Sequence, residues 1–203
     1  MPPNLKRLLV RLSLSWLLLV VVACGSQDSI LNSERIEKTF GSYGLDIIRS
    51  DDNGRVASLY SGSGADKVTR TFAVVEFRRP VRRAYAGEHA RVVSGESLGA
   101  VFKSAGWEIQ KVHIFIGEME IPQKYALLSD LMQISLPKYL ATHVYELVVR
   151  KEGRSYDYAR IVELHHPDYL SATDLEAIYG EIVFDDSQRN SVDDYIRPEI
   201  WGN

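Results

Sequence analysis

A five-residue stretch has the residue types and spacing to supply a nucleophile. Residues 95–99 read GESLG and fit the G-x-S-x-G pattern, in which a hydrolase serine stands on a sharp turn between a buried strand and a helix. A helix is predicted over 95–105, but residues 85–93 are too polar for a central strand, and no His-Gly-Gly-Gly run offers an oxyanion site. Ser94 is expected to cap the helix, with Ser97 in its first turn. We interpret Ser97 as structural and keep a catalytic serine as the alternative.

A second stretch carries the residue types that bind divalent metals. Residues 163–169 read ELHHPDY and include His165, His166 and Asp168. Neighbouring residues on a strand point to opposite faces, so the two histidines could share an ion only if the strand ends there, which Pro167 allows. We interpret the stretch as a corner between a strand and a helix, with imidazoles bonded to backbone groups. A metal site of His165, His166 and Asp168 is the alternative, and no cofactor is expected.

The only basic cluster of the predicted domain lies at 78–83, which reads RRPVRR. Arg78, Arg79, Arg82 and Arg83 present planar guanidinium groups that suit phosphates and carboxylates, so an anionic lipid or an acidic envelope protein is a possible contact. The simpler interpretation is a solvated loop.

The N-terminus has the three-part layout of a secretory signal. It contains three cations, an apolar run over 12–22 and the small residue Ala23. The run is shorter than the roughly 20 apolar residues of a membrane span. Residues 21–24, VVAC, resemble the lipobox of bacterial lipoproteins.

This resemblance implies a lipid anchor. In lipoproteins the cysteine receives a diacylglyceryl group, becomes the first residue after cleavage and is then N-acylated, so Cys24 is the expected lipid attachment site. Gly25 stands where an aspartate would signal inner-membrane retention, which implies the outer membrane of a Gram-negative host, with the periplasmic side favoured. Cys24 is also the only cysteine, so no intramolecular disulfide can form.

Net charge and length bear on the partners and the number of domains. Without residues 1–23 the chain carries 21 Lys and Arg against 27 Asp and Glu, a net charge of −6, which disfavours a nucleic-acid partner. We expect a signal peptide at 1–23, a tether at 24–32, one domain at 33–180, and an acidic, loosely ordered tail at 181–203.

Within the domain, short helices are predicted between strands rich in β-branched and aromatic residues. Helices are expected over 34–43, 95–105, 122–132 and 173–179. Strands are expected over 45–50, 55–61, 69–77 and 107–117, followed by a long hairpin over 139–167 that turns at 151–154.

Local signals set the predicted boundaries. Ser33 is expected to cap the first helix and Gly44 to end it, and Asn53-Gly54 is a strong hairpin turn. Pro122 is expected to open the third helix. Thr173 and Glu176 fit a capping box.

Hairpins adjacent in sequence favour the α+β class, an antiparallel or mixed sheet with helices packed on it. We expect a membrane-anchored envelope lipoprotein whose domain is a non-enzymatic binding or interaction module. The alternative is a membrane-tethered hydrolase that uses Ser97 or a metal at His165 and His166.

Overall fold

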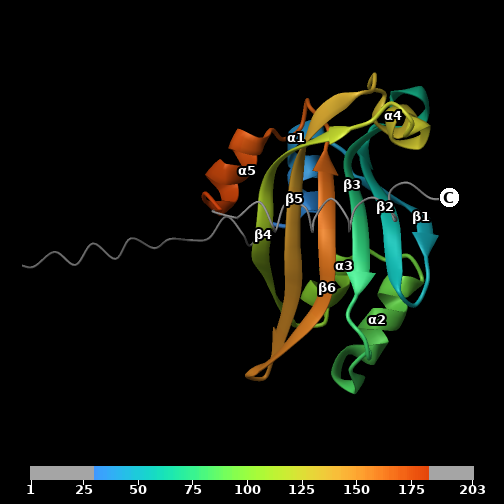
Figure 1. The fold of residues 1–203 in the computed structure, drawn as a ribbon. Helices are drawn as coiled ribbons and strands as arrows, with labels where there is room; N and C mark the ends of the chain where they lie inside the picture. The colour runs from blue at the N-terminus through green and yellow to red at the C-terminus, as the bar shows by residue number, and fades with distance from the viewer. Residues whose placement is uncertain (1–29, 183–203) are drawn as a thin grey trace, which may run out of the picture.

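The computed structural model describes residues 30–182, which fold as an α+β domain around one antiparallel sheet (Figure 1). The strand order is β1-β2-β3-β6-β5-β4, and every neighbouring pair is antiparallel. The strands are β1 (Gly44–Ser50), β2 (Gly54–Ser61), β3 (Val68–Phe77), β4 (Glu108–Ile121), β5 (Lys138–Lys151) and β6 (Arg154–His165). The predicted fold class is confirmed, with the sheet antiparallel rather than mixed. The signal sequence, Cys24 and residues 183–203 of the predicted tail 181–203 lie outside the described residues, whereas Ile182 packs against the core.

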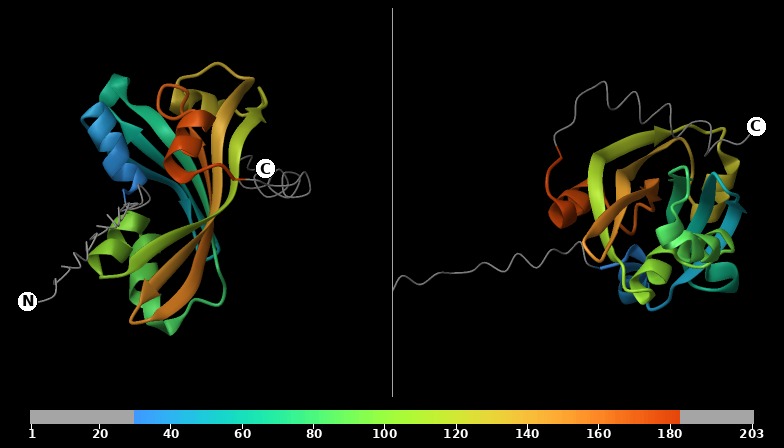
Figure 2. Two further views of the ribbon diagram at one scale, coloured as in Figure 1. Left: turned by 90° about the vertical axis from the view of Figure 1, so that its left-hand side faces the viewer. Right: turned by 90° about the horizontal axis from the view of Figure 1, so that it is seen from below.

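Five α-helices accompany the sheet among the described residues. They are α1 (Asn32–Phe40), α2 (Ala86–Val93), α3 (Leu98–Ser104), α4 (Ala126–Met132) and α5 (Ala172–Tyr179). Helices α1, α2, α3 and α5 pack on one face, and α4 packs on the other. The sheet is strongly twisted, and two further views show α1 and α3 standing over the same side of it (Figure 2).

Strand β3 shows why both faces of the sheet are buried. Its side chains alternate, so Phe72 and Val74 point to the α4 side, and Ala73, Val75 and Phe77 point to the side of α2 and α3. A strand covered on both faces needs an almost continuous apolar run, which this segment provides.

Both predicted hairpins form, but Asn53 and Gly54 are not the two central residues of the first turn, because neither has a positive φ and Gly54 already belongs to β2. At the β1–β2 turn the Asp51 carboxylate accepts hydrogen bonds from the backbone of Asn53 and Gly54, at 2.7 and 3.1 Å. At the β5–β6 turn Glu152 and Gly153 take positive φ angles of 53° and 71°. The long hairpin predicted over 139–167 is confirmed as β5 and β6.

The first helix was predicted with the wrong boundaries. It ends at Gly41, which has a φ of 75°, and not at Gly44. Gly44 belongs to β1, where a Cβ atom would lie 2.2 Å from the ring of Tyr60, so glycine lets this ring lie against the strand. The helix is capped by Leu31 and begins at Asn32. The predicted tether 24–32 therefore ends inside the folded domain.

Three other helix signals also need correction. Helix α4 begins at Ala126, after a turn, and not at Pro122. The capping box of α5 is formed by Ser171 and Asp174 and not by Thr173 and Glu176. Helix α2 was not predicted, because residues 85–93 were considered only as a strand and found too polar for one.

Candidate functional site

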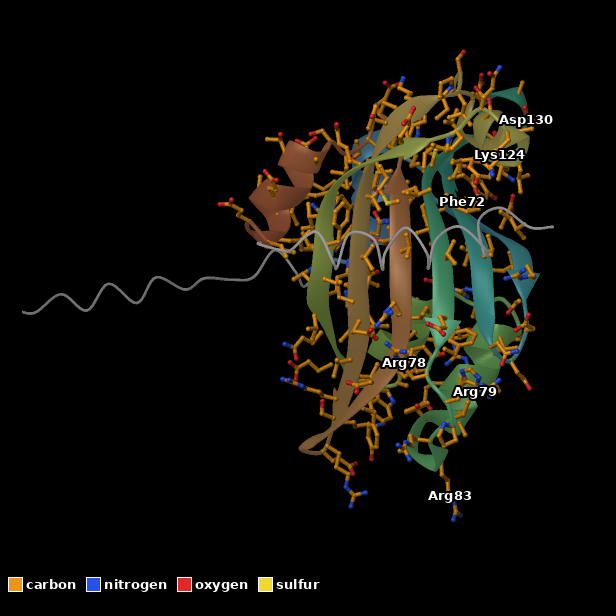
Figure 3. All side chains as sticks on the ribbon, viewed as in Figure 1. Phe72, Arg78, Arg79, Arg83, Lys124 and Asp130 are labelled. Carbon is orange, nitrogen blue, oxygen red and sulfur yellow. The ribbon has the colours of Figure 1, made fainter. Side chains whose placement is uncertain are left out.

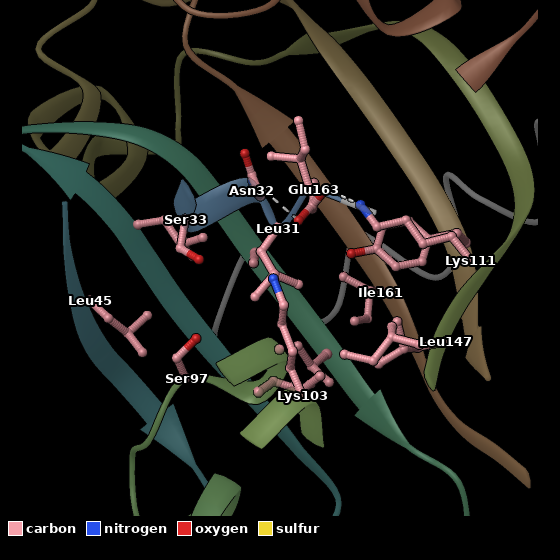
Figure 4. A pocket seen from close by; sticks show the side chains of 18 of the residues that line it. Leu31, Asn32, Ser33, Leu45, Ser97, Lys103, Lys111, Leu147, Ile161 and Glu163 are labelled. Atoms are coloured by element: carbon pink, nitrogen blue, oxygen red, sulfur yellow. Dashed lines mark hydrogen bonds and ion pairs between the residues drawn. The ribbon is translucent and has the colours of Figure 1, made fainter. Parts of the chain in front are cut away.

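A pocket of about 280 Å³ lies between the sheet and helices α1 and α3 (Figure 4). Apolar or small side chains from five strands form its floor: Leu45, Leu59, Ala73, Val75, Leu147 and Ile161. Leu31, Leu98, Gly99 and Trp107 form part of its wall. A largely apolar pocket with a few polar groups at fixed places is the common form of a small-molecule site.

Two polar groups lie on opposite sides of this pocket. One contains Glu163 and Lys111, and the other contains Arg55 and Ser97. Figure 4 shows Ser97 and Leu45 on one side and Lys111 on the other. We call them the Glu163 group and the Arg55 group. The Glu163 group consists of Glu163, Lys111, His143, His165, Asn32 and Thr71, and the Arg55 group consists of Arg55, Tyr43 and Ser97.

Glu163 is a buried carboxylate in the middle of the sheet. It lies on the inner strand β6, in register with Ala73 of β3 and His143 of β5. Asn32, the first residue of α1, donates a hydrogen bond from Nδ2 to Glu163 Oε1 at 3.3 Å, and Lys111 Nζ lies 4.0 Å from Oε2. A carboxylate in such surroundings needs partners of this kind to stay ionised.

The charge of Glu163 follows from its neighbours. Burial by itself raises the pKa of this carboxyl, and the positive charge of Lys111 is the main influence that lowers it below its usual value. Glu163 is therefore a carboxylate at neutral pH. His143 Nδ1 and His165 Nε2 lie 3.8 and 3.9 Å from its Oε2, beyond hydrogen-bond distance.

The two histidines are kept neutral. Burial lowers the pKa of His143 to about 3, although Glu163 opposes this. Burial likewise lowers the pKa of His165 to about 4. Their far nitrogens are bonded, His143 Nε2 to His113 Nδ1 at 2.8 Å and His165 Nδ1 to Thr71 Oγ1 at 3.0 Å.

Lys111 joins the sheet to α5. Its Nζ donates to the hydroxyl of Tyr179 at 3.1 Å and lies 4.5 Å from the ring centre of Tyr145. The aromatic faces and the carboxylate of Glu163 together stabilise the ammonium in a side chain that is only 12% exposed.

Arg55 is a buried cation of a different kind. It is 5% exposed, and its Nη1 donates to two backbone carbonyls in and after α2, those of Val92 at 3.3 Å and Glu96 at 2.8 Å. Its Nε is buried and has no hydrogen-bond partner. Within residues 30–182 no carboxylate forms an ion pair with Arg55. Burial lowers its pKa, while the phenols of Tyr158 and Tyr43 act in the opposite direction.

Ser97 lies in the pocket wall but lacks the surroundings of a nucleophile. The element before it is helix α2 and not a strand, and Ser97 is the N-cap residue of α3. Burial raises the pKa of the Tyr43 phenol, and the Ser97 hydroxyl opposes this and lowers it. No hydrogen bond joins Ser97 to a histidine in the described part of the chain. The prediction that Ser94 caps this helix was wrong, because Ser94 ends α2 and donates to the carbonyl of Arg91.

The two glycines of the GESLG stretch have structural roles. Gly95 has a φ of 112°, a conformation that favours glycine, and it separates α2 from α3. A Cβ atom on Gly99 would lie 2.8 Å from Leu31, so glycine lets the chain before α1 pack on α3. The pattern therefore describes a junction between two helices.

The structure separates the predicted metal ligands. His165 faces Glu163, whereas His166 accepts a hydrogen bond at Nδ1 from the backbone N–H of Asp168 at 3.0 Å. The Asp168 side chain is 78% exposed and lies 3.9 Å from His166. Within residues 30–182 there is no group of three or more His, Cys, Asp or Glu residues placed to hold a metal ion.

The arginine cluster is also divided. Arg78 pairs with Glu146, with an Nε–Oε2 distance of 3.1 Å, and Arg79 lies beside Asp52. Figure 3 shows Arg83 at the tip of the domain, and Arg82 is exposed as well. Of the four arginines, Arg82 and Arg83 are exposed and form no ion pair with another described residue.

Comparison with known proteins adds no assignment. No protein-family model matches the chain, and no curated protein has a detectably similar sequence. No helix within residues 30–182 combines the length and the apolar character needed to cross a membrane. The interpretation of the site therefore rests on its geometry.

Sequence analysis missed Arg55 and most of the Glu163 group. The available signal was polar residues at alternating strand positions, such as Lys111 with His113 and Glu163 with His165, because such pairs lie on one face of a sheet. Pairing between distant strands, which brings these faces together, is not visible in one sequence.

Proposed function

We propose that this protein is a lipid-anchored lipoprotein of the bacterial envelope whose α+β domain is a non-enzymatic binding module. Its ligand is a small, largely apolar molecule that occupies the pocket between the sheet, α1 and α3. The observation that carries the proposal is the pocket itself, with an apolar floor drawn from five strands and polar groups on two sides.

The anchor rests on the sequence. The apolar run ends in VVAC at 21–24, and the domain begins only a few residues later, so the pocket would lie close to the membrane. Two or three acyl chains on one cysteine hold a protein at a membrane almost permanently. Cys24→Ser should therefore leave uncleaved precursor or soluble protein. Normal processing and outer-membrane fractionation of this variant would refute the anchor.

Binding is favoured over hydrolysis by the surroundings of Ser97. A nucleophilic serine needs a base within hydrogen-bond reach and a third group that orients the base. Among the described residues that line the pocket there is no histidine, and the hydroxyl near Ser97 is the phenol of Tyr43.

The test uses Trp107, which lines the pocket and is 6% exposed. The full mature chain carrying Trp201→Phe is placed in lipid nanodiscs and titrated with an apolar chain that ends in bromine, which quenches tryptophan on contact. Empty nanodiscs measure partitioning of the probe. Saturable quenching of Trp107 is expected.

A matched pair of variants locates the binding. Ala73→Leu adds three carbons inside the pocket and should weaken quenching at least tenfold. Ala100→Leu adds the same side chain on the exposed face of α3 and should change nothing. Equal affinity for both variants would show that the pocket is not the binding site.

A further inference from the structure

Arg55 stands apart from the other cations of the pocket. Lys103 is paired with Glu34 at 2.6 Å, and Lys111 lies 4.0 Å from Glu163. Both lysines therefore have a carboxylate of the chain beside them. Arg55 has none within residues 30–182, although it is the most buried of the three.

Burial of a guanidinium without a counter-charge is unfavourable unless something replaces its water. Two carbonyls, of Val92 and Glu96, satisfy only Nη1. The Nε–H remains a buried donor without a partner, in a side chain that lines the pocket. A planar guanidinium fork with a free donor is suited to an oxyanion such as a carboxylate or a phosphate.

Two further donors line the same pocket as Arg55. The Tyr43 and Ser97 side chains both line the pocket, and the phenol of Tyr43 is influenced by the Ser97 hydroxyl and by the charge of Arg55. Hydroxyl groups can donate to an anion and reorient at little cost. The Arg55 group therefore offers three donor side chains from β2, the segment before β1, and the start of α3.

Apolar surface begins directly next to this group. Val75 is the partner of Arg55 across the β2–β3 pair and belongs to the pocket floor. The floor continues over Ile161 and Leu147 toward the opposite side. A ligand lying along it would have one charged end and one apolar body.

We infer that the ligand is an anionic amphiphile, whose oxyanion is bound by Arg55, Tyr43 and Ser97 and whose hydrocarbon part lies on the sheet. This inference rests on the proposed function. An acyl carboxylate and an alkyl phosphate share the required chemistry. The Glu163 group does not bind the anion, because its lysine already faces a carboxylate and its histidines are neutral.

The experiment compares matched bromine-tagged chains in the Trp107 quenching assay. The probes are 12-bromododecanoate, 12-bromododecyl phosphate, and the neutral methyl 12-bromododecanoate. At least one anion should bind ten times more tightly than the ester, and the comparison of the two anions identifies which oxyanion is preferred. Quenching in empty nanodiscs corrects for the different partitioning of the three probes.

Variants assign the preference to residues. Arg55→Gln should abolish the advantage of the anion, and Arg55→Lys should keep part of it. Tyr43→Phe combined with Ser97→Ala should reduce the advantage of the anion severalfold. This double variant retains Arg55 and its bonds to the backbone. It therefore tests the anion site even if Arg55→Gln does not fold. Lys103→Gln, which removes an exposed cation at the pocket wall, is the control and should leave the advantage unchanged.

The outcomes separate the two proposals. Saturable quenching with equal affinity for anions and ester overturns the inference but leaves the pocket as a binding site. An anion preference that is lost in Lys103→Gln and kept in Arg55→Gln also overturns it. Absence of saturable quenching by all three probes contradicts the proposed function itself.

Discussion

The Glu163 group and the Arg55 group both contain buried charge, but they solve the problem of burial differently. Glu163 lies between Lys111 and Asn32, so its charge is balanced inside the protein. Arg55 is held by backbone carbonyls, and within the described residues no carboxylate of the chain balances its charge. Glu163 has its counter-charge inside the protein, although His143 Nδ1 and His165 Nε2 beside it have no hydrogen-bond partner among the described residues. Arg55 lacks a counter-charge and would gain one from an added anion.

This difference suggests different roles for the two sides of the pocket. The Glu163 group connects α1 through Asn32 and α5 through Tyr179 to the centre of the sheet, so it should hold the domain together. Arg55 connects β2 to the end of α2 and to the loop that follows it. Stability should therefore depend strongly on the first group, and ligand choice on the second.

The largest expected effect is that of pH on the Glu163 group. His143 and His165 have pKa values of about 3 and about 4 in the folded protein, against 6.5 for an ordinary histidine. Between these values the unfolded chain binds more protons than the folded one, so stability is complete above about pH 6.5 and falls as the pH drops toward 4. From pH 7.5 to 5 the loss should be about 4 kcal/mol for the pair.

Urea unfolding at several pH values measures this loss. His143→Gln removes one of the two titrating histidines of the Glu163 group and should reduce the loss by about 2 kcal/mol. His89 and His166, whose pKa burial also lowers, add to the pH dependence of both proteins. A slope that is unchanged in this variant would mean that His143 is protonated in the folded protein or does not contribute.

Removal of Glu163 should have the next largest effect. Glu163→Leu deletes the negative charge that faces Lys111 and the acceptor of Asn32, and should lower the free energy of unfolding by about 3 kcal/mol at pH 7.5. Glu34→Gln, which breaks the more exposed pair with Lys103, should lower it by less than about 1 kcal/mol. Equal losses for Glu163→Leu and Glu34→Gln would show that the buried Glu163 stabilises the domain no more than an exposed ion pair does.

Removal of Arg55 should destabilise the protein less than removal of Glu163. Arg55→Met loses two hydrogen bonds to carbonyls but also removes an unbalanced buried charge, so the net loss should be about 1 kcal/mol in the absence of ligand. Urea unfolding of the ligand-free protein measures it. A loss as large as that of Glu163→Leu would show that Arg55 is a structural residue first.

The smallest effect is expected at Ser97. Ser97→Ala should change stability by less than about 1 kcal/mol, because the hydroxyl makes no capping hydrogen bond in α3. A fluorophosphonate probe should not label the folded protein. Labelling that disappears in Ser97→Ala would establish the hydrolase alternative.

Much of the fold could be predicted from the sequence because its signals are local. Alternating β-branched and aromatic runs predicted the strands, and Asn53-Gly54 and Gly153 marked two turns. Helix boundaries were less predictable. Gly44 looked like a helix end but serves close packing against Tyr60, a contact that depends on β1 pairing with β2.

The site was harder to predict because it depends on contacts between distant segments. Asn32 and Glu163 meet across 131 positions, and Arg55 meets the carbonyl of Glu96 across 41. The GESLG pattern has a structural explanation as well as a catalytic one, because a positive φ at Gly95 and close packing at Gly99 account for its two glycines. Residue types alone could not distinguish these reasons from catalysis.

The most direct test of the pocket as a ligand site is a crystal structure of the protein grown with 12-bromododecanoate, with anomalous data collected at the bromine edge. We expect a bromine peak over the pocket floor near Leu147 and the carboxylate of the ligand at Arg55. A bromine peak on the α4 face, or a pocket with no bromine at a saturating concentration of the ligand, would contradict it.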